Sequence, residues 1–327
     1  MTEDEFRAPQ FVQRVQAWAD ETTESLGFRA QGPLEQFHVR PWSTVFRVPT
    51  DRGTLFLKCC GPTQAFEPQL TALLHRIRPG IAPTVLAVHP EQPWMLVADG
   101  GQRIDKKYPG PEILDAWRAV LPRYAELQRA MTPHTADALA VGTPDRRADE
   151  LIAGLVTSIA DEPSLDRARD DRLTGDERAA LERAVPRVER ACADLAAFGI
   201  ADTVQHDDLH QGNVLIRDGR AVVFDWGDAC VSQPFLSLAV TLRFAASRAG
   251  LPEDAPAILA LRDAYLEPWT AEAAAEDLRA AAALGRRLGE LSRTLSWRVV
   301  ASTYPGVVDH YPGGFAGSLR RVLRHFA

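Results

Sequence analysis

Residues 202–228, DTVQHDDLHQGNVLIRDGRAVVFDWGD, constrain the fold of this 327-residue chain more than any other segment. Two short apolar runs, 214–216 and 221–224, flank four residues with Asp-Gly at their centre. Asp-Gly between apolar runs is a strong signal for a β-hairpin. Because a hairpin brings its two ends together, Asn213 before the first strand and Asp225 after the second should face one small volume.

An amide oxygen beside a carboxylate suits Mg²⁺, which prefers hard oxygen ligands and completes its shell with waters or phosphate oxygens. Asp208 lies five residues before Asn213, and His206 lies two residues before Asp208. This order, followed by a strand and Asp-x-Gly, matches the catalytic loop and metal loop of eukaryotic-type kinases. There, one Asp orients and deprotonates an attacking hydroxyl, while the Asn and the second Asp hold metal against nucleotide phosphates. The alternative interpretation is two polar loops around a hairpin, without chemistry.

A lysine in an apolar strand is the second notable feature. Residues 34–40, 44–49 and 54–60 have the pattern of three antiparallel strands joined by tight turns, after a helix over 9–26. Alternation places Lys58 among apolar neighbours on the third strand, and the helix that follows has Glu67 in its first turn. In kinases a strand lysine holds the α- and β-phosphates and is fixed by a carboxylate on the next helix. The alternative is a solvated lysine and a glutamate that serves the helix dipole.

The rest of the chain predicts a second, mainly helical part. Two more strands, 84–88 and 93–97, precede Gly100-Gly101, where we place a hinge. Helices are expected over 113–131, 147–159, 176–198, 233–247, 255–265, 271–301 and 315–326, with an exposed charged loop over 161–175. We therefore expect an α+β, bilobal, protein-kinase-like fold. Residues 1–100 would form a nucleotide-capping lobe with a small antiparallel sheet and one key helix, and residues 101–327 a larger helical lobe with the catalytic loop and substrate site.

Charge narrows the class of partner. With 37 Lys and Arg against 44 Asp and Glu, the net charge is −7, so nothing indicates nucleic acid. The negative balance mildly favours a cationic small substrate, or it serves only solubility. Four acidic residues of the second half could face such a substrate or simply water: Asp254, Asp263, Glu267 and Asp309.

The cysteines and the apolar runs bear on location. Cys59, Cys60, Cys192 and Cys230 show no paired spacing, which favours reduced thiols in a cytoplasmic protein. The first ten residues lack the apolar region of a signal peptide. No apolar run approaches about 18 residues, so we expect no membrane span. Nothing in the sequence indicates an oligomeric state.

The segments HDDLHQGNVL, VVFDWGDA, LFLK and FEPQLTALL together resemble the aminoglycoside phosphotransferase family of small-molecule kinases. The likeness covers roughly residues 30–250. It implies a protein-kinase-like fold and transfer of phosphate from ATP, with Mg²⁺, to a small hydroxylated compound. It further implies that Asp208 is the catalytic base, that Asn213 and Asp225 hold Mg²⁺, and that Lys58, braced by Glu67, holds phosphate. Ser43 would lie in the loop that covers the phosphates, and His206 would be structural.

Three positions depart from the family pattern. Asp207 stands where the family usually has glycine, and Ser237 stands where an aspartate often supports the catalytic loop. The loop 40–44, which would cover the phosphates, contains no glycine. The sequence therefore leaves open how the catalytic loop is braced and how the nucleotide is gripped.

Members of this family act on aminoglycosides, macrolides, choline, homoserine and sugars. We therefore expect a kinase of an aminoglycoside, an amino sugar or a similar metabolite. A protein kinase is disfavoured, because only a few residues separate Gly227 from Pro234 and no Ala-Pro-Glu follows. The alternative from another class is a non-catalytic nucleotide-binding protein on a kinase fold.

Overall fold

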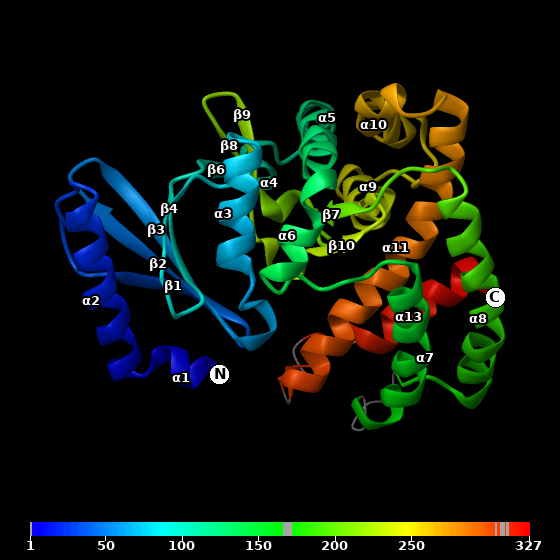
Figure 1. Ribbon diagram of the computed structural model, residues 1–327, viewed down its shortest axis with the longest axis horizontal. Coiled ribbons are helices and arrows are strands. Elements are labelled where there is room, and N and C mark those ends of the chain that lie inside the picture. Colours follow the sequence, from blue (N-terminus) through cyan, green and yellow to red (C-terminus); the bar gives the residue numbers. More distant parts are fainter. Residues whose placement is uncertain (1, 166–171, 305, 308–310, 312–313) are drawn as a thin grey trace.

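The computed structural model describes residues 2–165, 172–304, 306–307, 311 and 314–327. Its first part is a five-stranded antiparallel sheet in the order β1-β2-β3-β5-β4 (Figure 1). The strands are β1 (Glu35–Arg40), β2 (Ser43–Thr50), β3 (Gly53–Cys60), β4 (Val85–Val88) and β5 (Trp94–Ala98). Each strand that the sequence predicts is present, with its ends shifted by at most one residue.

The two faces of this sheet have different neighbours, because side chains alternate along each strand. Two helices cover the outer face: α1 (Glu3–Arg7) and α2 (Pro9–Ser25). There Phe11 of α2 meets Trp94 of β5 edge to face, with ring centroids 5.9 Å apart, and Leu57 lies in the same core. Lys58 lies on the opposite, inner face, in register with Val45 and Met95.

Helix α3 (Glu67–Ile77) links the sheet to the rest of the molecule. It follows a short 3₁₀ helix, η1 (Pro62–Gln64), and stands between the sheet and α5 (Ile113–Met131) (Figure 1). Leu70 and Leu74 of α3 belong to the same core as Trp117 of the second half. The inner face of the sheet therefore meets a helix whose apolar side is anchored in the other half.

The second half is mainly helical and is organised around α11, which packs against α7, α9 and α13. Its long helices are α5 (Ile113–Met131), α7 (Ala148–Leu165), α8 (Gly175–Ala196), α9 (Leu238–Ala249), α10 (Pro256–Leu266), α11 (Ala275–Thr303) and α13 (Phe315–Phe326). The shorter elements are α4 (Ile104–Lys107), α6 (Thr135–Ala140) and the 3₁₀ helix η5 (Pro234–Ser237). None of the helices in the described part of the chain combines the length and apolarity needed to cross a bilayer.

One prediction for this half is wrong: the charged segment 161–175 is not a loop throughout. Helix α7 continues to Leu165, and Glu162 within it is fully buried. The Glu162 carboxylate accepts a hydrogen bond from the backbone nitrogen of Leu173 at 2.9 Å and pairs with Arg178 of α8 at 2.7 Å. Because these partners satisfy the buried charge, the helix can continue through it. Residues 166–171 lie outside the described residues.

The predicted hairpin is present as β8 (Val214–Arg217) and β9 (Arg220–Val223). Asp218 and Gly219 at its turn have φ angles of 50° and 74°, the left-handed values that a two-residue type I′ turn requires. Two further pairings frame it: β6 (Gln102–Arg103) with β8, and β7 (Thr203–Gln205) with β10 (Cys230–Ser232). The division into lobes 1–100 and 101–327 stays a prediction, and β6, which follows the proposed hinge, pairs with the second half.

Candidate active site

The hairpin brings Asn213 and Asp225 to one end of its two strands. Val214 pairs with Val223 there, and the backbone nitrogen of Phe224 donates to the carbonyl oxygen of Asn213 at 3.0 Å. Asp225 has a left-handed φ of 65°, which turns the chain away from the strand direction. The two residues therefore lie at the same end of the hairpin, as the sequence predicts.

The loop after β7 is fixed from inside by His206. This side chain is buried, and its ring centroid lies 4.8 Å from that of Trp226. Its Nε2 donates to the carbonyl oxygen of Phe224 at 2.9 Å, and its Nδ1 accepts from the backbone nitrogen of Asp208 at 3.3 Å. Burial lowers the pKa of His206, so the ring stays neutral. Both nitrogens are used to hold the loop, which supports a structural role.

Asp208 follows in this loop, with its side chain 19% exposed. Its Oδ1 lies 3.3 Å from Nη2 of Arg293, and its Oδ2 lies 3.6 Å from Nε2 of His210. Nδ1 of His210 accepts from the backbone nitrogen of Gly212, which places the proton of a neutral ring on Nε2. Burial raises the pKa of Asp208 to about 8 against the opposing effect of Arg293, with help from neighbouring carboxylates. A carboxylate with a raised pKa is a stronger proton acceptor.

Lys58 joins the sheet to the end of the hairpin. Its Nζ donates to Glu67 Oε1 at 2.8 Å and to Asp225 Oδ1 at 2.5 Å. Asp225 lies 167 positions after Lys58 in the sequence. Burial disfavours the ammonium, but the carboxylates of Asp225 and Glu67 outweigh it and raise the pKa of Lys58. Glu67 is fully buried, whereas the Asp225 side chain is 42% exposed. Asp225 is thus the carboxylate of this group that a ligand can reach.

Ser43 lies at the start of β2, on the same sheet face as Lys58. It is paired with Cys60, two residues beyond Lys58 on β3, and is buried. The loop before it carries Trp42, whose carbonyl oxygen accepts from the backbone nitrogen of Gly61 at 2.6 Å. The Trp42 ring lies 6.3 Å from that of Tyr304 at the end of α11. This glycine-free loop is therefore supported by an aromatic contact from the second half.

Asn213 and Asp225 suit a hard divalent cation. Asn213 Nδ2 donates to the carbonyl oxygen of Asp208 at 3.0 Å, so its amide oxygen points the other way. Lys58 contacts Oδ1 of Asp225 and leaves Oδ2 for another partner. Across the described residues, no three or more His, Cys, Asp or Glu side chains gather in a way that could hold a metal. One amide and one carboxylate leave most of an octahedral shell to waters and phosphate oxygens, as Mg²⁺ prefers.

Comparison with known proteins decides the family. A model of the phosphotransferase enzyme family matches residues 40–278, well over half of the chain. The chain belongs to this phosphotransferase enzyme family. No curated protein matches it.

Solved structures show the same fold at low sequence identity. A choline/ethanolamine kinase family protein from Mesorhizobium loti has a TM-score of 0.58 and 18% identity, covering 96% of this chain and 98% of that chain. A macrolide 2′-phosphotransferase from Brachybacterium faecium has a TM-score of 0.58 and 16% identity, covering 93% and 98%. A thermostable aminoglycoside phosphotransferase mutant, in ternary complex with ADP and hygromycin B, has a TM-score of 0.55 and 16% identity, covering 96% and 99%. The predicted family, the small-molecule kinase class and the kinase-like fold are confirmed.

Asp207, which replaces the usual glycine of the phosphotransferase enzyme family, turns away from the proposed metal ligands. Its φ of 62° is left-handed, which explains why glycine suits this position. Its buried carboxylate accepts hydrogen bonds from Arg146 at 2.7 Å and from Ser292 and Ser296 of α11 at 2.5 and 2.8 Å. Burial alone would raise the pKa of Asp207, but Arg146 and Arg293, together with the hydrogen bonds from Ser292 and Gln205, outweigh burial and lower it. Asp207 therefore ties the catalytic loop to α11.

Ser237, the second departure from the family pattern, also braces this loop. Its hydroxyl donates to Gln205 Oε1 at 3.1 Å and lies 2.8 Å from the hydroxyl of Tyr124. The Tyr124 hydroxyl accepts from the backbone nitrogen of His206 at 2.9 Å. A buried network of neutral side chains thus holds the loop at the place where the family often has an aspartate.

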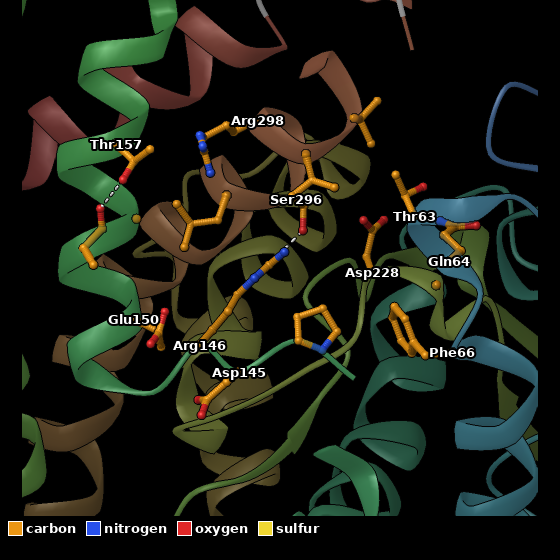
Figure 2. Close-up of a pocket in the computed structure, with 17 residues that line it drawn as sticks. Thr63, Gln64, Phe66, Asp145, Arg146, Glu150, Thr157, Asp228, Ser296 and Arg298 are labelled. Atoms are coloured by element: carbon orange, nitrogen blue, oxygen red, sulfur yellow. Dashed lines mark hydrogen bonds between the residues drawn. The ribbon is translucent and has the colours of Figure 1, made fainter. Parts of the chain in front are cut away.

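A pocket of about 280 Å³ lies beside Asp228, between η1 and the helices α7 and α11 (Figure 2). Gln64 and Phe66 border it from the N-terminal half, and Arg146 and Ser296 from the second half. Of the acidic residues proposed to face a substrate, Asp254 and Glu267 are exposed, and Asp263 pairs with Arg262 and Arg279. Asp309 lies outside the described residues.

Sequence reasoning missed Arg146, Tyr124 and Arg293. Each of these side chains contacts residues 206–208 from an element distant in sequence, so no local motif indicates the contact. The one available signal lies within the long helix: Ser292 and Ser296 are four residues apart, as are Arg293 and Trp297. Polar residues four positions apart lie on one face of a helix, where they can share a buried partner.

Proposed function

We propose that this protein transfers the γ-phosphoryl group of ATP, with Mg²⁺, to a hydroxyl group of a small molecule. The observation that carries the proposal is that Lys58 binds both Glu67 and Asp225. Asp225 follows the second strand of the hairpin, and Asn213, just before the first strand, donates a hydrogen bond to the backbone of Asp208. Phosphoryl transfer asks a protein mainly to position groups and to neutralise charge. Lys58 on β3 would supply the cation, and Asp208 in the loop after β7 the proton acceptor. Asn213 and Asp225, at one end of the hairpin, would supply the oxygen ligands.

Each residue then has a defined task. Asp208 orients the acceptor hydroxyl and takes its proton while the hydroxyl oxygen forms a bond to the γ-phosphorus, and the bond to the β,γ-bridging oxygen breaks to release ADP. Lys58, held by Glu67, binds the α- and β-phosphates, and Ser43, at the start of β2 and not in the loop as the sequence predicts, borders the loop that covers them. Asn213 and Asp225 would hold Mg²⁺, which neutralises phosphate charge when bound. His206 keeps the loop in place.

The proposal is tested by the matched pair Asp208→Asn and Asp218→Asn. Asp208→Asn should lower kcat for ADP release by about 10²- to 10⁴-fold, the usual worth of a positioned base. Asp218, exposed at the hairpin turn, should tolerate the same change without loss. ADP release is measured with Mg·ATP and a panel of hydroxyl compounds. A kcat of Asp208→Asn within about tenfold of the wild type would contradict the role of the base.

The competing class is a non-catalytic nucleotide-binding protein on the same fold. It predicts that Mg·ATP binds without turnover on any acceptor in the panel. A protein kinase receives no support, because the segment between Gly227 and Pro234 contains the strand β10, which is paired with β7. The expectation of an aminoglycoside or amino sugar acceptor, and of a cytoplasmic location, stays a prediction.

A further inference from the structure

Arg293 of α11 bridges two carboxylates at the proposed transfer site. Its Nη2 lies 3.3 Å from Oδ1 of Asp208, and its Nη1 lies 3.1 Å from Oδ2 of Asp228. The side chain is only 13% exposed, and a guanidinium keeps its charge under all ordinary conditions. The two carboxylates that could have attracted a substrate cation are therefore already paired with a cation of the protein.

The same guanidinium also covers an aromatic ring. Its central carbon lies 5.4 Å from the centroid of Trp297, one helical turn further along α11. The face of a tryptophan is the most favourable aromatic site for an ammonium group. Arg293 thus occupies both kinds of site, carboxylate and ring face, on which an amine-bearing acceptor would depend.

Most of the charged side chains that line the pocket beside Asp228, among them Asp145, Arg146 and Arg298 (Figure 2), are also paired with opposite charges of the protein. Arg147 binds the Asp145 carboxylate through Nε at 2.9 Å, and Arg293 pairs with Asp228. Arg146 and Arg298, the lining cations, are themselves paired with Asp207 and Asp161, each at 2.7 Å. Glu150 is the remaining carboxylate of this wall and is exposed. A polyamine would find few uncompensated negative charges here.

We infer that the acceptor carries no positive charge near its reacting hydroxyl, and that Arg293 excludes amine-bearing compounds. The inference rests on the proposed function. It reverses the preference suggested by net charge, because local pairing rather than the total of −7 decides what a buried site attracts. Nη1 of Arg293 is buried against Asp228, so a substrate cation cannot displace it without uncovering two carboxylates. The pocket shares Asp228 with this bridge, and at about 280 Å³ it is at the small end for ligand sites.

Matched acceptors test this in the wild type. ADP release is compared between glucose and glucosamine, and between glycerol and its amino counterpart serinol. We expect kcat/KM to favour the uncharged member of each pair by at least about tenfold, equivalent to about 1.4 kcal/mol. Faster transfer to glucosamine and serinol would overturn the inference, while the effect of Asp208→Asn on ADP release reports separately on the proposed function.

A binding experiment covers the case in which no panel member is phosphorylated. Choline and kanamycin are titrated by calorimetry into the wild type, Arg293→Gln, Arg293→Lys and the control Arg286→Gln. Arg286 lies on the same helix and pairs with Glu253 at the surface, 3.0 Å away. Arg293→Gln should bind both amines at least about tenfold more tightly than the wild type, since it frees Asp208 and Asp228. Arg293→Lys and Arg286→Gln should both resemble the wild type.

Three results would overturn the role of Arg293, two of them in the wild type and Arg293→Gln. One is tight binding of kanamycin or choline by the wild type, and the other is equal exclusion by Arg293→Gln when its thermal unfolding shows a folded protein. If Arg293→Gln does not fold, the charge-preserving Arg293→Lys and the wild-type comparison of matched acceptors still decide. A third such result would be binding of choline or kanamycin by Arg293→Lys as tight as by Arg293→Gln, since lysine keeps the charge.

Discussion

At the scale of single residues, the most consequential charge is that of Lys58. Its side chain is almost fully buried and pairs with two carboxylates, Glu67 and Asp225. Of these two, Glu67 is fully buried. Lys58→Met should lower the free energy of unfolding by about 3–5 kcal/mol, because it leaves Glu67 as an uncompensated buried charge. Lys106→Met, at an exposed position of α4, should change it by less than about 0.5 kcal/mol. Urea denaturation without nucleotide measures both, and equal midpoints would show that Lys58 is not held by this pair.

The residues that sequence could identify are those with local partners in a motif. Lys58 and Glu67 are nine positions apart on consecutive elements, and the hairpin sets Asn213 against Asp225 by turn chemistry alone. Arg293 could not be found this way. It reaches Asp208 from a helix 85 positions later, and that contact depends on how α11 packs.

At the scale of elements, α11 holds the catalytic loop through Asp207. Its carboxylate pairs with Arg146, and both side chains are buried. Because the folded pKa of Asp207 is depressed, the ion pair stabilises the protein above the ordinary aspartate pKa of about 3.9, and this stabilisation disappears as pH falls through the folded value.

Asp207→Asn therefore has a predicted pH signature. The variant should lose about 3–5 kcal/mol of unfolding free energy near neutral pH, since Arg146 is left buried without its partner. The difference from the wild type should shrink as the pH is lowered below about 4. Urea unfolding over a pH series measures it. A difference that stays constant with pH would mean that Asp207 acts through its shape or backbone conformation and not through its charge.

The elements themselves were largely predictable, and the exception has a physical cause. Periodicity located the strands and most long helices, and the predicted helix over 176–198 is α8, which Thr174 caps with a capping box to Glu177. The continuation of α7 past residue 161 was not predictable. A charged run reads as a solvated loop unless one knows that Glu162 meets Arg178 on a neighbouring helix.

At the scale of the whole molecule, the sequence indicated two halves and their order but not how they lock together. Helix α3 follows the sheet in the chain, yet its apolar side lies in the core of the second half. The strand β6, directly after Gly100-Gly101, pairs with β8 of the hairpin that carries the proposed metal ligands. The position of the five-stranded sheet relative to Asp225 therefore depends on the pairing of β6 with β8.

A substitution at Gly101, directly before β6, can test the importance of the pairing between β6 and β8. Its φ is +97°, and a Cβ there would lie 2.3 Å from the carbonyl oxygen of Ile216. Gly27 also has a positive φ, +76°, but a Cβ there would meet nothing within 4 Å. Gly27→Ala should therefore show backbone strain alone, about 1–2 kcal/mol, whereas Gly101→Ala should add the clash and push β6 away from β8. We expect a lower melting temperature for Gly101→Ala than for Gly27→Ala, together with weaker Mg·ATP binding by calorimetry. Equal losses in the two variants, with unchanged nucleotide affinity, would mean that the β6–β8 pairing does not set the distance between the two halves.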